Sequence, residues 1–262
     1  VLAWDASVPA REKVHEELGV QVGFPLLGTW GKVDCCLICT PPDSHLYYAT
    51  RAVEQGIPVF IEKPISNTIV GVENLLQLAK AKGVLIQVGY NLRFHSGLKQ
   101  LKDHLSDIGT PLSFQSHFGQ YFPDWRPGQD YKASYSTKLG ILLEASHEFD
   151  YARWLLGDAV VLNSHTKNTG TVGFDAEDMA DVQLLFNNSI SGNIHLNAVE
   201  RNYSRWCTII GTEGTLRWDY QGMGASFLGH EAKFYGISAP TDMYVEEISS
   251  FLQCVKEGTT PE

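Results

Sequence analysis

Residues 34–64 read DCCLICTPPDSHLYYATRAVEQGIPVFIEKP, and this stretch decides the fold. We expect an apolar strand at 34–40, after which two prolines lead into a helix over 43–56 with apolar residues at helical spacing. A second apolar strand is expected at 58–61, directly before a Glu-Lys-Pro sequence. Strands this apolar, separated by helices, are typical of a parallel sheet that is covered on both faces.

The same alternation extends to both sides of this stretch. Toward the N-terminus we expect a short strand at 1–5 and a helix at 9–19. Toward the C-terminus we expect a helix at 68–82 and a strand at 84–89. The first domain, residues 1–91, is therefore predicted to be an α/β domain with a Rossmann-like parallel sheet.

The pattern changes after this domain. Residues 92–262 are predicted to form an α+β domain with a large, mainly antiparallel sheet that is open on one face, because its strand-like runs alternate apolar and polar residues. The expected elements are a helix at 94–105, a strand at 111–121, a loop at 122–138, a helix at 141–156, four or five strands between 160 and 220, and a helix at 243–256.

Composition excludes several classes of protein. The chain has 262 residues and a formal net charge of −10, which argues against a nucleic-acid partner, since phosphate binding needs a basic face. No apolar run reaches the roughly 18 residues of a membrane helix, so no membrane partner is expected. The cysteines number five, and Cys36 and Cys39 would point to opposite faces of a strand. We expect buried, reduced thiols in a cytoplasmic protein.

The strand ends of the first domain carry candidate cofactor-binding residues, because ligands of open α/β sheets bind beyond the carboxyl ends of the strands. Asp5 ends the first strand, where an acid can hold ribose hydroxyls or instead cap a helix. Thr40, Pro41, Pro42 and His45 precede and begin the next helix, whose free N–H groups can face an anion. The alternative is an ordinary connection between strand and helix.

Two further pairs of residues could carry acid/base chemistry. Glu62 and Lys63 follow a buried strand, where a lysine can act in proton transfer, although a surface Glu–Lys pair is the alternative. Glu144 and His147 share a face of the predicted helix with Tyr151, as an acid/base pair or as a solvated face. The string from His147 to Tyr151 lacks the second histidine of H-E-x-x-H, so no metal site is predicted.

The loop before this helix holds a third candidate. Trp125 and Arg126 offer an apolar plate and a planar cation, which suit a carboxylate, a phosphate or a sugar face. A surface turn is the alternative, but long ordered loops are often functional.

These motifs together resemble the glucose–fructose oxidoreductase / inositol dehydrogenase / MocA (Gfo/Idh/MocA) family, over nearly the whole chain. The resemblance implies an NAD(P)-dependent oxidoreductase that transfers a hydride between nicotinamide and a secondary alcohol of a sugar, cyclitol or related compound. It also implies a homodimer or homotetramer formed through the open sheet. The motifs that carry it are Thr40-Pro-Pro, Glu62-Lys63-Pro64, Gly89-Tyr-Asn-Leu-Arg93-Phe and Gly140-Ile-Leu-Leu-Glu-Ala-Ser-His-Glu-Phe-Asp150.

The resemblance also implies roles for single residues. Lys63 would orient the reacting hydroxyl and the nicotinamide, and His147 would be the general acid/base, with Glu144 as its helper. Asp5 would hold the ribose hydroxyls and favour NAD over NADP. The implied cofactor-binding residues are Asp5, Thr40, Pro41, Pro42, His45, Glu62, Lys63 and Asn91, and the implied substrate-binding residues are Lys63, Arg93, Trp125, Arg126 and His147.

Three departures from the family pattern affect these expectations. Relatives carry an Asp three or four residues before the histidine, where this chain has Leu143 and Glu144. The preceding glycine run is reduced to Gly140. The Gly-rich pyrophosphate turn belongs roughly 20 residues before the ribose-binding acid, which would place it upstream of Val1. We therefore expect an internal fragment that binds NAD weakly or not at all.

Two alternative functions stay open. A catalytically silent module that binds NAD or a sugar, such as a sensor, would tolerate the Leu143 departure and the missing glycines. An NAD-dependent glycosidase of the same family would keep the cofactor and change the reaction.

Overall fold

The computed structural model describes residues 1–23, 33–125, 139–187, 189–221, 224–228, 233–235 and 242–261. The N-terminal part contains β1 (Leu2–Ala3), α1 (Val8–Leu18), β2 (Gln21–Val22), β3 (Cys36–Ile38), α2 (Pro42–Glu54), β4 (Val59–Glu62), α3 (Val72–Lys82) and β5 (Ile86–Gly89). The rest contains η2 (Asn91–Phe94), α4 (Ser96–Asp103), η3 (Leu105–Ile108), β6 (Pro111–Gly119), α5 (Phe122–Trp125), α7 (Ile141–Glu144), α8 (His147–Leu156), β7 (Ala159–Lys167), β8 (Met179–Phe186), β9 (Ile190–Asn197), β10 (Ser204–Gly211), β11 (Thr215–Asp219), β12 (Gly224–Leu228), β13 (Lys233–Tyr235) and α9 (Asp242–Glu257).

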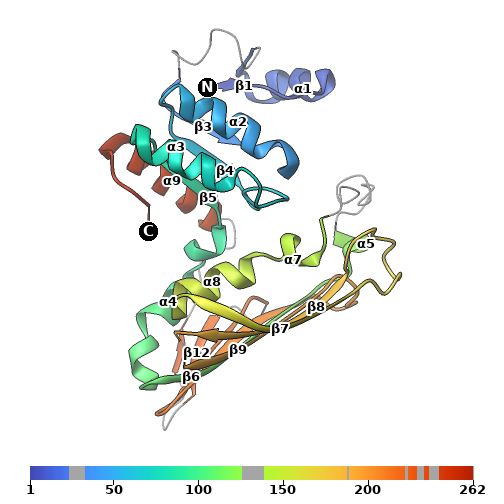
Figure 1. Cartoon of the computed structure of the whole chain (residues 1–262), viewed down its shortest axis with the longest axis vertical. Coiled ribbons are helices and arrows are strands. Elements are labelled where there is room, and N and C mark those ends of the chain that lie inside the picture. The colour runs from blue at the N-terminus through green and yellow to red at the C-terminus, as the bar shows by residue number, and fades with distance from the viewer. Residues whose placement is uncertain are drawn as a thin grey trace.

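The N-terminal part is built on a parallel sheet, as the apolar strands predict. Strands β3, β4 and β5 pair in that order, and every pair is parallel. Val59 and Ile61 of β4 are fully buried, and α2 packs on β3 and β4 and against α3 (Figure 1). The first predicted strand is shorter than expected and lies outside this sheet, because β1 pairs instead with β2. Strand β2 has only two residues and was not predicted from the sequence.

The second part is built on an eight-stranded sheet in the order β13-β12-β11-β10-β6-β9-β8-β7. Its neighbours are antiparallel except β6 and β9, which run parallel, so the predicted mainly antiparallel sheet is confirmed. Buried and exposed residues alternate along β8 and β9. Helices α4, α7 and α8 cover one face, and the other face is open (Figure 1).

The two helices predicted in the first half of the second part, at 94–105 and 141–156, are both interrupted. The segment predicted as a helix at 94–105 divides into η2, α4 and η3, and the one at 141–156 divides into α7 and α8 around Ala145 and Ser146. His147 and Tyr151 both lie in α8, one turn apart, so they share a face of that helix as predicted. That face is not a solvated one, because Tyr151 is fully buried and its hydroxyl bonds Ser116 in the core.

The C-terminal helix α9 returns to the N-terminal part of the chain (Figure 1). Phe251 of α9 contacts Phe60 of β4, with ring centroids 5.7 Å apart. α9 also packs extensively on η2, the segment that leaves the first sheet. Among the helices of the described residues, none is long and apolar enough to cross a membrane.

Candidate active site

A cleft of about 670 Å³ lies where the carboxyl ends of β4 and β5 face the second sheet. Further parts of its wall come from the start of α2, η2, the end of β6, α5, α7, the start of α8 and the start of β10. α9 closes it with Met243, Tyr244 and Glu247. Segments far apart in the sequence thus meet at the strand ends, where open α/β sheets bind their ligands.

Lys63 joins the two parts of the chain across this cleft. It follows β4, and its Nζ donates a hydrogen bond of 2.7 Å to the main-chain carbonyl of Glu144. The same Nζ lies 3.5 Å from Glu144 Oε2, and the two side chains are only 17% and 11% exposed. The side chain of Glu144 therefore reaches Lys63 as well as its main-chain carbonyl does.

The interruption between α7 and α8 makes this contact possible. In a continuous helix the Glu144 carbonyl would accept the N–H of Glu148. Here the Glu148 N–H bonds the Ala145 carbonyl instead, at 3.3 Å. The Glu144 carbonyl is thus left for the Lys63 ammonium.

His147, the first residue of α8, lines the cleft beside this pair. Burial, followed by the positive charges of Arg205 and Lys63, holds the pKa of its imidazole well below the usual 6.5. The ring stands edge-on to Tyr90 with centroids 5.5 Å apart, and its enclosed Nδ1 has no partner within the described residues. A neutral imidazole of this kind can accept a proton from a bound hydroxyl at neutral pH.

Arg205 and Glu148 form a second ion pair at the floor of the cleft, and sequence reasoning missed it. Arg205 Nε and Nη2 donate to the two carboxylate oxygens of Glu148 at 2.7 and 3.1 Å, and Glu148 is fully buried. Burial alone would lower the pKa of Arg205, but the attraction of Glu148 outweighs it and raises that pKa. An acid among apolar helix positions was the one available signal, since its partner is 57 residues away.

The predicted cofactor-binding residues separate into two groups. Thr40, Pro42, Glu62 and Asn91 line the cleft, and the enclosed Asn91 Oδ1 has no partner among the described residues. An unpaired acceptor at this position fits a ligand that brings a hydrogen-bond donor. Pro41 precedes α2 as its N-cap residue and has no side-chain cap hydrogen bond.

Asp5 and His45 do not line the cleft. Asp5 Oδ1 accepts the N–H of Ser7 at 2.7 Å, but the N-cap residue of α1 is Ser7 itself, so Asp5 is not the cap; ribose binding by Asp5 stays a prediction. His45 is fully buried, and its ring nitrogens lie 2.9 Å from the Pro64 carbonyl and 2.6 Å from the Thr40 carbonyl. It fastens the segment after β3 to the turn after β4, rather than facing a ligand.

The predicted substrate-binding residues are likewise divided. Trp125 lines the cleft and packs on Phe122 with centroids 5.1 Å apart. Arg93 donates to both carboxylate oxygens of Asp150 at 2.8 and 2.7 Å, which holds its guanidinium away from the cleft wall. Arg126 lies outside the described residues. No cluster of three or more potential metal-ligating side chains occurs in the described ranges.

Comparison with known families and proteins agrees with this arrangement. The family profile described as "Oxidoreductase family, NAD-binding Rossmann fold" matches residues 1–90, and "GFO/IDH/MocA C-terminal domain" matches residues 99–217. The chain is 26% identical to the scyllo-inositol 2-dehydrogenase (NAD(+)) of Bacillus subtilis in an alignment of 275 positions, gaps included, that covers 95% of this chain and 76% of that protein. It is also 26% identical to the myo-inositol 2-dehydrogenase of Thermotoga maritima, over 95% of this chain and 78% of that one.

Solved structures show the same fold. The complex of levoglucosan dehydrogenase with NADH superposes with a TM-score of 0.86 at 19% identity, covering 99% of this chain and 81% of that one. The UDP-N-acetylglucosamine 3-dehydrogenase GnnA of Acidithiobacillus ferrooxidans gives a TM-score of 0.83, over 97% and 80% of the two chains.

Proposed function

The chain belongs to the Gfo/Idh/MocA family of NAD-binding oxidoreductases, and from its cleft we propose that it transfers a hydride between NAD and a secondary alcohol of a neutral sugar or cyclitol. The meeting of Lys63, Glu144 and His147 carries this proposal, because it places a cation and a neutral base on one wall. Removal of a hydroxyl proton during hydride transfer needs a base, and a nearby cation stabilises the oxygen as the proton leaves.

Different residues orient the substrate, accept its proton and hold the cofactor. The Lys63 ammonium, fixed by Glu144, donates a hydrogen bond that orients the substrate oxygen and favours its loss of a proton. His147 accepts that proton on its imidazole, which the low pKa keeps neutral beforehand. Thr40, Glu62 and Asn91 would hold the nicotinamide end of NAD, which when bound supplies the hydride acceptor.

The charge balance of the cleft supports a neutral substrate. Lys63 is paired with Glu144, and Arg205 is paired with Glu148, so the two cations around the base are each matched by a carboxylate. A substrate carboxylate or phosphate would find no unmatched cation among these four groups. Hydroxyl groups, in contrast, can both donate to and accept from such pairs.

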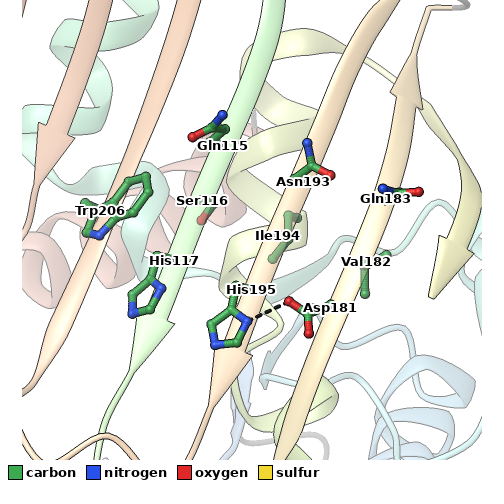
Figure 2. A pocket seen from close by; sticks show the side chains of 10 residues that line it. All are labelled: Gln115, Ser116, His117, Asp181, Val182, Gln183, Asn193, Ile194, His195 and Trp206. Atoms are coloured by element: carbon green, nitrogen blue, oxygen red, sulfur yellow. Dashed lines mark hydrogen bonds and ion pairs between the residues drawn. The ribbon is translucent and has the colours of Figure 1, made fainter. Parts of the chain in front are cut away.

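We also propose self-association through the open face of the second sheet. A hollow of about 300 Å³ lies on this face. A row of rings carried by the neighbouring strands β10, β6 and β9 crosses it (Figure 2). His117 stacks between His195 and Trp206, with centroid distances of 5.2 and 5.6 Å, and His195 Nδ1 lies 2.7 Å from Asp181 Oδ1. Such a row is ordered before any partner arrives, which lowers the entropic cost of association.

The edge of this sheet adds apolar surface. Val160, Val161 and Leu162 of β7 are 54%, 62% and 61% exposed, and an exposed apolar edge strand favours pairing with another chain. Sedimentation at several protein concentrations should reveal a dimer or tetramer that Val161→Lys weakens; a wild-type chain that stays monomeric at high concentration would exclude this assembly.

We propose a reducing, cytoplasmic location, because all five cysteines are free. The expectation that they are buried is wrong for three of them: Cys35 and Cys36 are partly exposed and Cys39 is exposed, whereas Cys207 and Cys254 are buried.

The enzymatic proposal is tested by NADH absorbance over a panel of sugars and cyclitols. We expect Lys63→Ala and His147→Ala each to slow turnover by about a hundredfold or more, because each removes a group that acts on the same proton. Lys13→Ala is a matched control, since that lysine is exposed and pairs only within α1. Binding of NAD without turnover of any member of the panel would instead favour the silent module, and release of a glycoside's leaving group would favour the glycosidase.

A further inference from the structure

The C-terminal helix brings an enclosed carboxyl group to the cleft that no step above uses. Glu247 of α9 lines the cleft but is only 2% exposed. Its Oε1 is fully enclosed and has no hydrogen-bond partner within the described part of the chain. A buried carboxylate without a partner is costly, so this group demands an explanation.

The register of the first sheet shows which groups face Glu247. Phe251 lies one helical turn beyond Glu247 and contacts Phe60 of β4, so this side of α9 faces β4. Glu62 lies two residues beyond Phe60 and therefore points to the same face of the sheet. Running antiparallel to the strand, α9 thus places Glu247 near Glu62, at the strand end that continues into Lys63.

The surroundings of Glu247 favour its uncharged form. Burial, followed by the negative charges of Glu62 and Asp150, raises the pKa of Glu247 to about 8. Two neighbouring elements also carry enclosed acceptors without partners among the described residues, Gln87 Oε1 on β5 and Asn91 Oδ1 on η2. A protonated carboxyl can donate a hydrogen bond, so it suits a region with unpartnered acceptor oxygens better than a carboxylate does.

We propose that Glu247, in its protonated form, is a positioning residue that keeps α9 closed over the strand end carrying Glu62 and Lys63. The inference rests on the proposed function, because Lys63 is the group whose placement it serves. Charged groups reach Glu247 from two neighbouring elements: Glu62 from β4, and Asp150 from α8, which is itself paired with Arg93 of η2. Loss of the Glu247 proton would set a second carboxylate against Glu62 and loosen this end of the cleft.

Unfolding of the full chain in urea between pH 5 and pH 9 tests the state of this group. Glu247→Gln keeps the shape and a donor but does not titrate, and Glu246→Gln is the matched control, because Glu246 is exposed and pairs with Lys99. Since the folded pKa lies above the ordinary 4.5, the folded chain keeps a proton that the unfolded chain has lost between these values. Wild-type stability should therefore fall as pH rises toward 8 and level off above it.

The size of the expected change in the unfolding constant follows from the one proton that the folded chain keeps on Glu247. Relative to Glu247→Gln, the wild-type unfolding constant should rise about tenfold per pH unit across this window. Glu246→Gln should behave as wild type. Parallel pH dependences of wild type and Glu247→Gln would overturn the proposal. Should Glu247→Gln fail to fold, NMR of the Glu247 carboxyl carbon in the wild-type chain decides the same point: a midpoint near 8 supports it, and an ordinary acidic midpoint overturns it.

The pH dependence of kcat then distinguishes a residue that positions Lys63 from one that only stabilises the fold. Wild-type kcat should fall as pH passes 8, whereas kcat of Glu247→Gln should stay level there, with little change in KM at neutral pH. Coinciding rate profiles beside different stability profiles would overturn the positioning role. No hydride transfer in wild type would overturn the proposed function, whereas the unfolding and NMR results would still report on the carboxyl group.

Discussion

Replacing Glu148 by Gln should be among the most damaging single changes in the second part of the chain. The change keeps the size of the side chain and removes its charge. Arg205 would then keep one weak acceptor in place of a carboxylate that accepts two hydrogen bonds, at 2.7 and 3.1 Å. Its guanidinium, which Glu148 holds in the charged form, would stay at the floor of the cleft without a counter-charge.

The burial of the Glu148–Arg205 pair determines how much unfolding free energy Glu148→Gln costs. The Glu148 side chain is 0% exposed and that of Arg205 is 11% exposed, so water cannot replace the lost partner. Breaking a buried pair from one side costs about 3–5 kcal/mol of unfolding free energy. The pair of Arg153 and Asp158 is the matched comparison, because its side chains are 63% and 86% exposed. Asp158→Asn should therefore cost no more than about 1 kcal/mol.

Urea unfolding at neutral pH, followed by circular dichroism, measures both changes. A double-mutant cycle with Arg205→Met separates the interaction from the loss of each side chain. We expect the double variant Glu148→Gln/Arg205→Met to be less destabilised than the sum of the two single variants, because no charge is then left unmatched. Strictly additive losses, or a Glu148→Gln cost equal to that of Asp158→Asn, would refute the idea that this buried pair acts as a unit.

Three other changes test separate parts of the structure. Arg205→Met removes a positive charge that lowers the pKa of His147, so the acidic limb of the kcat–pH profile should move to higher pH; an unmoved limb would exclude this influence. Gly97→Ala would place a Cβ 2.6 Å from the buried Trp218 ring, and overpacking of this kind should cost about 1–3 kcal/mol in urea unfolding, so an unchanged midpoint would contradict the packing. Burial raises the pKa of Cys39, so its alkylation at neutral pH, followed by mass spectrometry, should be slower than that of glutathione although Cys39 lines the cleft.

Local hydrophobic patterns predicted the architecture because they report on single elements. The apolar strand before Glu62 and the alternating residues of β8 and β9 each determine a type of sheet without reference to distant residues. The same locality made Lys63 a candidate, since a charged residue directly after a buried strand has few structural reasons to be there. The predicted parallel and mainly antiparallel sheets are confirmed.

The parts that sequence reasoning missed depend on contacts over long distances in the chain. The helix over 141–156 is interrupted, and the carbonyl left available at Glu144 binds a lysine 81 residues away. No periodicity encodes that exchange, because the residues on both sides of the break remain good helix formers. Glu148 and Glu247 were missed for the same reason: each is an acid whose setting is decided by another element, Arg205 of β10 in one case and the end of β4 in the other.

These contacts make the cleft a product of three separate segments. Lys63 comes from the first sheet, Glu144 and His147 come from the helices on the second, and Glu247 comes from the last helix, which returns to the first sheet. Their positions are mutually dependent: the carbonyl and carboxylate of Glu144 hold Lys63 Nζ, and the charge of Lys63 contributes to the low pKa of His147. Displacing the segment that carries Lys63 would therefore change the pKa of His147 before the chain unfolds. The pH dependence of turnover should accordingly respond to substitutions in α8 and α9 outside the cleft wall that shift these helices.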